Sequence, residues 1–412
     1  MSSLSQSFIR DKFADYYKKN ATSILPPSSL ERREFGFLLL EKRVMIRHKV
    51  FRDLDSLRAS LCSVVPSDVY YSSAYYEHPD EEMKSKGWLG ADLVFDIDAD
   101  HIPTPCATVH DIWVCIGCGV SGKGGHPIKC SVCGGTKFKE KPWLCEICLE
   151  ASKVEVIKLI DMLRDEFGFS SEVLTVAFSG HRGYHVHVES ESIRDLDSLA
   201  RKEIVDYVMG IGLEAKFHGI GKSAESSRKV SGPDLNDRGW RGRLAKGTFD
   251  FLLTASKEDL MKTGLKSRHV NPLFKHREAI LKSWNKKGPW GSIKNISFET
   301  WRKIAQYGVE KHSVKIDTVV TSDINRLIRF PNSLHGKTGL KKVEFPFTQI
   351  EDFDPLKNAV AFKTGEVTVH ISAAPQFRVE EEVYGPFEKQ KVELPTAAAL
   401  MLLCKGMAEV VK

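Results

Sequence analysis

Residues 96–98 carry two carboxylates at a spacing that suits a divalent cation. Asp96 and Asp98 follow an apolar run, residues 93–95, that is typical of a buried strand. Side chains two residues apart on a strand point to the same face, so these two carboxylates would lie side by side. Like charges held together are unfavourable without a cation between them, and Mg²⁺ or Mn²⁺ prefers such oxygen ligands. A solvated strand end would show the same triplet, so the pattern alone does not establish a metal site.

Residues 179–187, Ser-Gly-His-Arg-Gly-Tyr-His-Val-His, form a candidate phosphate-binding turn between two apolar runs. The two glycines allow close approach of a ligand to the backbone, and Ser, Arg and His donate hydrogen bonds to phosphate. Three other interpretations compete: a plain hairpin turn, a transition-metal site at His185 and His187, and a nucleophilic Ser179. The nucleophile lacks support because Ala177 replaces the first glycine of a Gly-x-Ser-x-Gly elbow. Phosphate binding is favoured because the acids and this basic turn would then share one sheet.

A third segment, residues 315–339, combines one acid with several groups that could bind an anion. Asp317 is a candidate third carboxylate, and Arg326, Arg329, His335 and Lys337 follow it. Taken alone, this pattern indicates only a short helix and a polar loop.

The cysteines indicate metal binding. Seven of the nine lie between Cys106 and Cys148, and clustering in pairs argues against a disulfide scaffold. The candidate ligands form four pairs: Cys106/His110, Cys115/Cys118, Cys130/Cys133 and Cys145/Cys148. Tetrahedral Zn²⁺ takes two such pairs, so up to two ions are expected. His101 or His126 could replace His110, and a single zinc with free thiols is the simpler alternative.

The elements that must position these residues can be read from the apolar periodicity. Helices are expected at residues 7–20, 53–62, 149–167 and 395–410, and strands at 35–40, 43–51, 93–97, 173–178, 184–189, 314–320, 341–345, 359–363 and 367–371. Residues 195–310 show helical patterns and hold four of the seven tryptophans. Strands on both sides of a helical insertion predict one α+β core with a mixed sheet.

Composition sets the remaining limits. The chain has 412 residues, and 60 Lys and Arg against 54 Asp and Glu give a net charge of +6, which permits an anionic partner without requiring one. No apolar run approaches the ~20 residues that cross a bilayer. The first 20 residues resemble no signal or transit peptide, so we expect a cytoplasmic or nuclear protein. The basic run at residues 216–247 is interpreted as a solvated loop in preference to a nucleic-acid contact.

Taken in order, the three segments resemble the catalytic small subunit of archaeal and eukaryotic DNA primases. The resemblance is carried by Phe-Asp-Ile-Asp at 95–98, Ser-Gly-x-Arg-Gly-x-His at 179–185, and Ile-Asp at 316–317 with Arg-Leu-Ile-Arg-x-Pro-x-Ser-Leu-His-Gly-Lys-Thr-Gly at 326–339. It extends to Arg-Glu-Phe-Gly-Phe at 33–37 and Met-Ile-Arg-His at 45–48, so it covers most of the chain. His187 is closer to the archaeal pattern, because eukaryotic members often have Trp there.

The resemblance implies a role for each matching residue. Asp96, Asp98 and Asp317 would bind catalytic Mg²⁺ or Mn²⁺. The triphosphate of the incoming nucleotide would be held by residues of the second and third segments, namely Ser179, Arg182, His185, Arg329 and His335, with Arg47 beside the active centre. The implied reaction is two-metal nucleotidyl transfer, which makes short RNA and possibly also DNA primers on a single-stranded DNA template.

The resemblance also implies how the zinc ligands pair and how the chain divides. A zinc knuckle that closes with Cys-x-x-C before a helix pairs Cys106 and His110 with Cys145 and Cys148. The inner cysteines, Cys115, Cys118, Cys130 and Cys133, would then form an inserted ribbon with a second structural zinc. Residues 1–100, 149–194 and 311–412 would form the catalytic core, residues 101–148 the zinc-binding insertion and residues 195–310 a mainly helical insertion.

The implied partners are a large primase subunit with an iron–sulfur cluster, single-stranded DNA template, and ribo- or deoxyribonucleoside triphosphates, without a membrane. The expected location is the archaeal cytoplasm, at the nucleoid, or the nucleus in a eukaryote. Two alternatives stay open: a polymerase of the same superfamily that extends or repairs ends without starting chains, and a non-catalytic zinc-ribbon protein that binds nucleic acid.

Overall fold

The computed structural model describes residues 2–41, 43–223, 226–284, 288–290 and 296–411, and no side chain between residues 222 and 230. The chain forms two compact units. Unit 1 comprises Met1–Ile157, Phe169–Lys202 and Lys315–Lys412, and unit 2 comprises Lys158–Gly168 and Glu203–Val314. Each unit is built from segments that are distant in the sequence.

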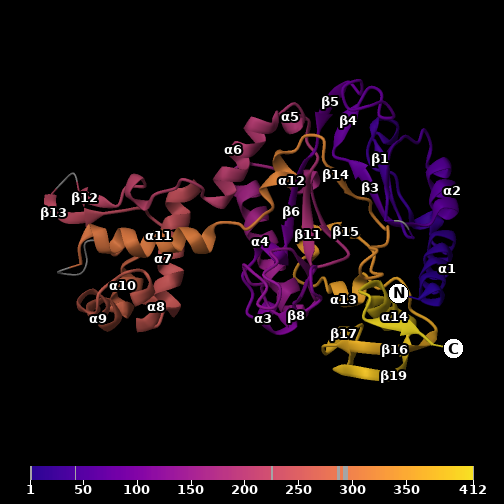
Figure 1. The fold of residues 1–412 in the computed structure, drawn as a ribbon. Coiled ribbons are helices and arrows are strands. Elements are labelled where there is room, and N and C mark those ends of the chain that lie inside the picture. The colour runs from indigo at the N-terminus through magenta and orange to yellow at the C-terminus, as the bar shows by residue number, and fades with distance from the viewer. Residues whose placement is uncertain (1, 42, 224–225, 285–287, 291–295, 412) are drawn as a thin grey trace. The chain divides into compact units, whose positions relative to one another are not determined.

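Two antiparallel four-stranded sheets form the centre of unit 1 (Figure 1). The first has the order β14 (Leu327–Arg329), β3 (Pro66–Ser72), β1 (Phe35–Leu39), β2 (Met45–Lys49). The second has the order β15 (Val343–Pro346), β10 (Leu174–Phe178), β11 (Gly183–Val188), β6 (Leu93–Asp98). The helices of unit 1 include α1 (Ser3–Lys19) and α2 (Leu54–Val64). The predicted α+β class is confirmed.

The pairing of β6 with β11 brings the acidic strand against the basic turn. In its register Asp96 lies opposite His185 and Asp98 lies opposite Gly183. Both strands are rich in β-branched and aromatic residues that suit a buried sheet. The predicted sharing of one sheet by the acids and the turn therefore agrees with the structure.

The cysteine-rich segment forms a small module between β6 and helix α4. It comprises the helix α3 (Ala107–His110) and a three-stranded sheet in the order β8 (Ser121–Lys123), β7 (Ile112–Cys115), β9 (Phe138–Lys141). Helix α4 (Glu146–Asp165) begins at its last pair of cysteines. Such a short sheet has little apolar core of its own, so other links must hold it together.

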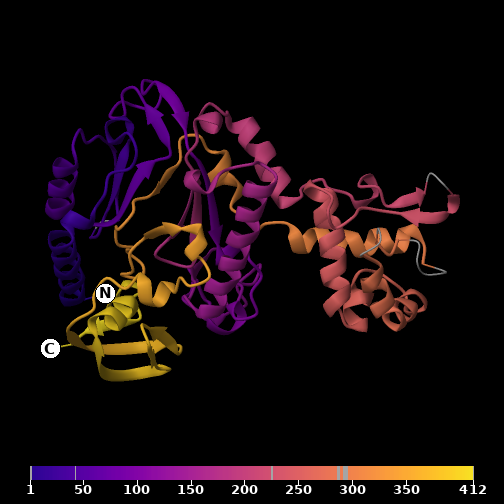
Figure 2. The same cartoon turned by 180° about the vertical axis from the view of Figure 1, so that it is seen from behind.

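The C-terminal part of unit 1 is a three-stranded sheet covered by a helix. The strand order is β19 (Phe387–Pro395), β16 (Glu366–Ala374), β20 (Ala408–Val410), and the helix is α14 (Thr396–Cys404). Leu400 to Leu403 of α14 are fully buried, as expected of a core helix. The two ends of the chain meet here, because the Val410 amide donates to the Ser5 hydroxyl at 2.9 Å (Figure 2).

The smaller elements of unit 1 join these parts. They are the strand pairs β4 (Ala74–Tyr76) with β5 (Trp88–Ala91) and β17 (Phe377–Val379) with β18 (Glu382–Tyr384), and the helices α5 (Glu191–Arg194), α12 (Thr318–Ser322) and α13 (Pro355–Asn358). Helix α6 (Ser198–Met209) contributes residues to both units.

Unit 2 is mainly helical and packs around tryptophans. Its own helices are α7 (Gly239–Thr254), α8 (Lys257–Lys262), α9 (Ser267–Lys275), α10 (Arg277–Ser283) and α11 (Phe298–His312), with one hairpin, β12 (Gly221–Ser223) and β13 (Ser226–Ser231). The ring centroid of Trp290 lies 5.7 Å from that of Trp284 and 5.4 Å from that of Trp301. Helices α7 and α11 cross at Gly247 and Gly308, where a Cβ on Gly247 would lie 2.7 Å from the Gly308 carbonyl oxygen.

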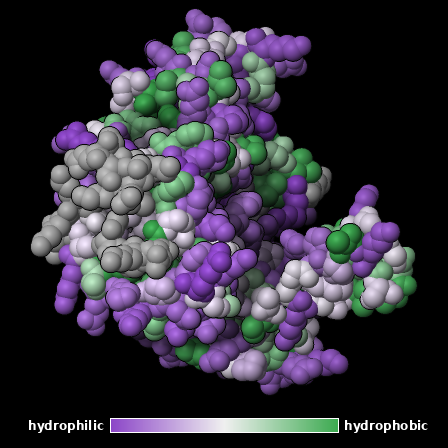
Figure 3. Space-filling model, turned by 90° about the vertical axis from the view of Figure 1, so that its left-hand side faces the viewer, coloured by the Kyte–Doolittle hydropathy of each residue, from purple (hydrophilic) through white to green (hydrophobic). Residues whose placement is uncertain are grey.

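The basic run at 216–247 contributes ion pairs within unit 2. Arg241 pairs with Asp237 at 3.1 Å, and Arg243 pairs with Glu166. The side chains of Lys222, Arg228 and Lys229 lie outside the described part of the chain. On the face drawn in Figure 3, hydrophilic residues predominate and hydrophobic ones are scattered between them. None of the described helices is long and apolar enough to span a bilayer.

Three predicted elements are wrong. Residues 318–322 form α12 instead of a strand, because Asp317 caps the helix and its carboxylate accepts from the Val319 amide at 2.9 Å. Residues 359–363 form no strand, and the closing helix ends at Cys404 before β20 begins at Ala408. Local propensity favoured strand in the first case, and tertiary contacts decided otherwise.

The close approach of β6 to β11 predicts that Gly183 tolerates no side chain. A Cβ at residue 183 would lie 2.1 Å from the Ile97 carbonyl oxygen, so Gly183→Ala must displace the strand that carries Asp98. We expect Gly183→Ala to lower the free energy of unfolding by about 2–4 kcal/mol in urea titration. The control is Gly125→Ala, where a Cβ meets nothing within 4 Å. Equal stability of the two variants would contradict the prediction.

Candidate active site and metal centres

A cavity of about 210 Å³ lies between the two four-stranded sheets of unit 1. Asp96 and Asp98 of β6 line one side, and Arg329 of β14 and Tyr70 of β3 line another. The carboxylate of Asp96 lies 3.7 Å from the imidazole of His185, its partner across β6 and β11. The cavity therefore combines acidic and basic groups from segments more than 200 residues apart in the sequence.

The carboxylates in this cavity are electrostatically crowded. Burial, together with the charges of Asp98 and Asp317, raises the pKa of Asp96 to about 7. Burial likewise raises the pKa of Asp98. Buried, crowded carboxylates are stabilised when a bound cation neutralises their charge. The donor set fits Mg²⁺ or Mn²⁺, which take carboxylate oxygens as ligands.

Asp317 lies beside the cavity and is not part of its lining. Its backbone amide donates to the Asp96 carbonyl oxygen at 2.9 Å, and its carboxylate caps α12. Among the described residues, the three carboxylates do not form a group with all ligand atoms within 4.8 Å of one another. The cap uses Oδ1 of Asp317, so the second carboxylate oxygen could bind a cation while the cap stays in place.

The basic side of the cavity contains more groups than the sequence motifs singled out. Ser179, His185, Arg329 and His335 line it as predicted positions. It is also lined by Arg326 and Lys337, which the sequence indicated only as groups that could bind an anion, and by His181, to which no role had been assigned. The rings of His181 and His335 stack with their centroids 5.1 Å apart. The stack, which joins residues 154 positions apart, leaves no local sequence signal.

The three imidazoles of the cavity are uncharged at neutral pH. Burial lowers the pKa of His181, His185 and His335 well below the usual range, and neighbouring cations lower it further. Neutral imidazoles donate or accept hydrogen bonds without adding positive charge. The charge available to an anion therefore comes from the guanidinium and ammonium groups of the cavity.

The loop that carries His335 is fixed through Asp68. This buried carboxylate pairs with Arg329 and accepts from the Gly336 amide at 3.1 Å. Arg329 also donates to the Tyr70 hydroxyl at 3.2 Å. A Cβ on Gly336 would lie 2.7 Å from the Asp68 carboxylate, so this glycine is required for the close approach.

Two predicted phosphate contacts lie outside the cavity lining. The Arg182 guanidinium is buried and donates to the Asp111 carboxylate at 3.1 Å and the Trp143 carbonyl oxygen at 3.0 Å, and it pairs with Asp100. Arg47 donates to the buried Glu34 at 2.9 Å. Both side chains are held by carboxylates in the structure, and their contact with a nucleotide phosphate stays a prediction.

Two groups of four ligands in the cysteine-rich module have the geometry of zinc sites. The first unites Cys106, His110, Cys145 and Cys148, and the second unites Cys115, Cys118, Cys130 and Cys133, each with its ligand atoms within 4.8 Å. Sulfur–sulfur distances of 3.4–3.6 Å approach the ~3.7 Å expected around a tetrahedral ion with Zn–S of about 2.3 Å. These are the two sets that the sequence predicted, and both could hold zinc.

Asp111 connects the first of these groups to the basic turn. Its carboxylate lies 2.7 Å from Nδ1 of His110 and accepts from the Trp143 amide at 2.8 Å and from Arg182. Carboxylates in this position fix the orientation of a metal-binding histidine. Asp111 therefore links the cysteine-rich module to Arg182 of the basic turn, the residue next to His181.

The comparisons with known proteins all indicate the same family. The model of the DNA primase small subunit family matches residues 134–347. The DNA primase small subunit PriS of Methanothrix thermoacetophila is 34% identical over 100% of both chains. The corresponding proteins of Methanococcoides burtonii (34% identical, 98% of this chain and 97% of that one) and Archaeoglobus fulgidus (33% identical, 98% of each) are similar over nearly the same span.

The contact between Asp111 and His110 predicts selective weakening of one zinc site. Asp111→Asn keeps an acceptor but removes the charge, so we expect affinity at the Cys106, His110, Cys145, Cys148 site to fall by about 10–100-fold. Zinc transfer to a chromophoric chelator should release one ion early, while the four-cysteine site keeps its ion. The exposed Asp352→Asn is the control. Simultaneous release of both ions would contradict the prediction.

The raised pKa of Asp96 predicts a pH-dependent gain in stability on its removal. A free Asp titrates near 3.9, so between about pH 4 and pH 7 the folded protein binds more protons and loses stability as pH rises. Without added Mg²⁺ or Mn²⁺, Asp96→Asn should raise Tm by roughly 2–5 °C at pH 8, and by less at pH 5. Differential scanning calorimetry checks this, and an equal gain at both pH values would contradict it.

Proposed function

The chain belongs to the DNA primase small-subunit family, and from this premise we propose that it is the catalytic subunit that synthesises short primers on single-stranded DNA. The observation that carries the proposal is the pairing of β6 with β11 at the cavity. It sets the crowded carboxylates of Asp96 and Asp98 against His185 and the Ser179 turn. Acids beside phosphate donors suit nucleotidyl transfer.

The acidic side of the cavity would hold the catalytic cations. We assign Asp96 and Asp98 as direct ligands and Asp317 as the third, through the carboxylate oxygen that does not cap α12. When bound there, Mg²⁺ or Mn²⁺ supplies activation of the attacking 3′-hydroxyl and neutralisation of the leaving group. The raised pKa values of Asp96 and Asp98 support this assignment, because burial disfavours their charged forms and a bound cation would favour them.

The basic side would hold the triphosphate of the incoming nucleotide. Ser179, His185, Arg329 and His335 keep the role that the resemblance implies, and the structure supports adding His181 and Lys337. Arg329 is oriented toward this role by Asp68 and Tyr70. We assign Arg182 a positioning role instead, since its guanidinium ties the turn to Asp111.

The remaining parts of the proposal concern zinc and partners. Two structural zinc ions would stabilise the cysteine-rich module through the two ligand groups described above. The designation "small subunit" of the relatives implies a large subunit, and we propose a heterodimer with an iron–sulfur partner. Template DNA and ribo- or deoxyribonucleoside triphosphates would be the substrates, in the archaeal cytoplasm.

The decisive experiment is primer synthesis on a circular single-stranded template without any 3′-hydroxyl. We expect metal-dependent products from the wild-type chain and a loss of at least about 100-fold in Asp98→Asn, which removes a charged metal ligand. Asp15→Asn, an exposed acid of α1, is the matched control. Incorporation only on primed templates would indicate an extending polymerase, and near-wild-type activity of Asp98→Asn would overturn the metal assignment.

A further inference from the structure

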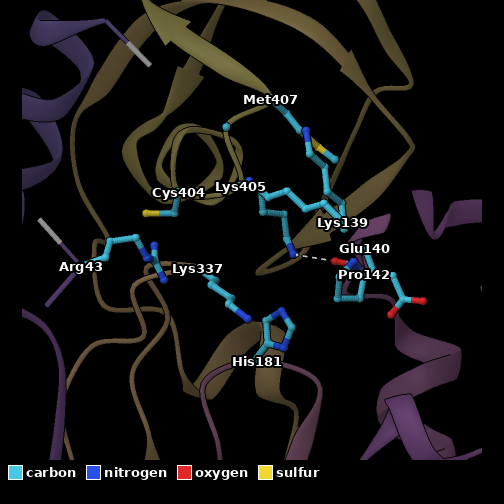
Figure 4. Close-up of a pocket in the computed structure, with 11 residues that line it drawn as sticks. Arg43, Lys139, Glu140, Pro142, His181, Lys337, Cys404, Lys405 and Met407 are labelled. Carbon is cyan, nitrogen blue, oxygen red and sulfur yellow. Dashed lines mark hydrogen bonds between the residues drawn. The ribbon is translucent and has the colours of Figure 1, made fainter. Parts of the chain in front are cut away.

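A second cavity of unit 1, of about 540 Å³, adjoins the candidate active site. The side chains around it, drawn in Figure 4, come from five separate parts of the chain: residue 43, the segment 139–142, residue 181, residue 337, and residues 404–407 at the end of α14 and directly after it. Two of its lining residues, His181 and Lys337, also line the cavity of Asp96 and Asp98. The two cavities are therefore neighbours with a shared wall of basic side chains.

The lining of this second cavity is strongly cationic. Its basic side chains are Arg43, Lys139, Lys141, His181, Lys337 and Lys405, and Glu140 is its one acid among the described residues. It contains no Phe, Tyr or Trp on which a base could stack. This composition suits an anion rich in phosphate, and it does not suit a nucleoside.

Lys405 lies at the centre of this basic set. It follows α14, donates to the Pro142 carbonyl oxygen at 3.2 Å and lies 5.2 Å from the centre of the Trp143 ring (Figure 4). Burial, together with the charges of Arg182 and Lys337, lowers the pKa of Lys405 to about 8. The cations of this region repel one another, and an anion between them would relieve that repulsion.

We propose that this basic cavity binds inorganic pyrophosphate, the leaving group of the nucleotidyl transfer; this inference rests on the proposed function. In that reaction the primer 3′-oxygen forms a bond to the α-phosphorus, and the bond from the α-phosphorus to the α,β-bridging oxygen breaks. The bond's electron pair stays on pyrophosphate, and the hydroxyl proton passes to water. Lys337 and His181, which face both cavities, connect the triphosphate site to the pyrophosphate site.

The test measures binding of ³²P-labelled pyrophosphate to the full chain by equilibrium dialysis without added Mg²⁺ or Mn²⁺. We expect Lys405→Met to weaken binding by about tenfold, the effect of losing one charge-assisted contact. Lys405→Arg should retain most of the affinity because it keeps the charge. Lys391→Met, which removes an exposed lysine of β19, should bind like the wild type.

A second variant tests whether weaker binding in Lys405→Met comes from a folding defect. Lys139 is an exposed residue of β9, so Lys139→Met leaves the core intact and should weaken pyrophosphate binding by a smaller factor. Asp98→Asn should bind pyrophosphate at least as tightly as the wild type, because the acid lies in the other cavity. Its primer-synthesis assay tests the proposed function independently of this binding measurement.

Two outcomes would overturn the inference. The first is wild-type affinity for pyrophosphate in both Lys405→Met and Lys139→Met. The second is that these variants bind pyrophosphate like the wild type but bind a single-stranded oligonucleotide with 5′-hydroxyl ends more weakly. That result would assign the cavity to a nucleic-acid backbone. In an active preparation, weaker product inhibition by pyrophosphate in Lys405→Met would support the inference.

Discussion

The antiparallel register of β6 and β11 is the constraint on which the rest of the site depends. It sets Asp96 opposite His185 and Asp98 opposite Gly183. Only a residue without a Cβ fits opposite Asp98, since the Ile97 carbonyl oxygen lies in the way. A shift by one residue would turn both carboxylates to the other face of the sheet. The backbone thus fixes the acids before any metal or nucleotide contributes.

Unit 1 keeps charges of opposite sign in neighbouring cavities, and this separation has an energetic cost. Burial raises the pKa of both Asp96 and Asp98, and the charge of Asp98 raises that of Asp96 further. On the other side, Lys405 and Lys337 repel one another. A net charge of +6 hides this distribution, because the acids and bases nearly cancel in the total. The sheets and α14 hold these like-charged groups in place, and bound ligands would neutralise them.

The sequence predicted what local patterns determine. The apolar runs located β6, β10 and β11 within about two residues. The cysteine spacing gave four pairs of ligands, and the family resemblance combined them into the two groups that the structure brings together. The strand expected at 314–320 is wrong for residues 318–322, which form α12, because the β-branched residues after Asp317 favour a strand and the cap was visible only in three dimensions. The stacked pair His181 and His335 was missed for a similar reason, because it depends on a contact across 154 residues. The roles of the site residues and the division into three parts stay predictions.

The position of Arg182 explains why a metal-binding insertion lies between β6 and α4. The insertion leaves the sheet just after Asp98 and returns at Cys145, so its two ends must be held near the acids. The first ligand group ties these ends together through Cys106 and Cys148. Asp111 then connects that group to Arg182, whose backbone carbonyl accepts from the Ala99 amide at 3.3 Å. A zinc ion there would stiffen the end of β6 from outside the cavity, without occupying space that a nucleotide needs.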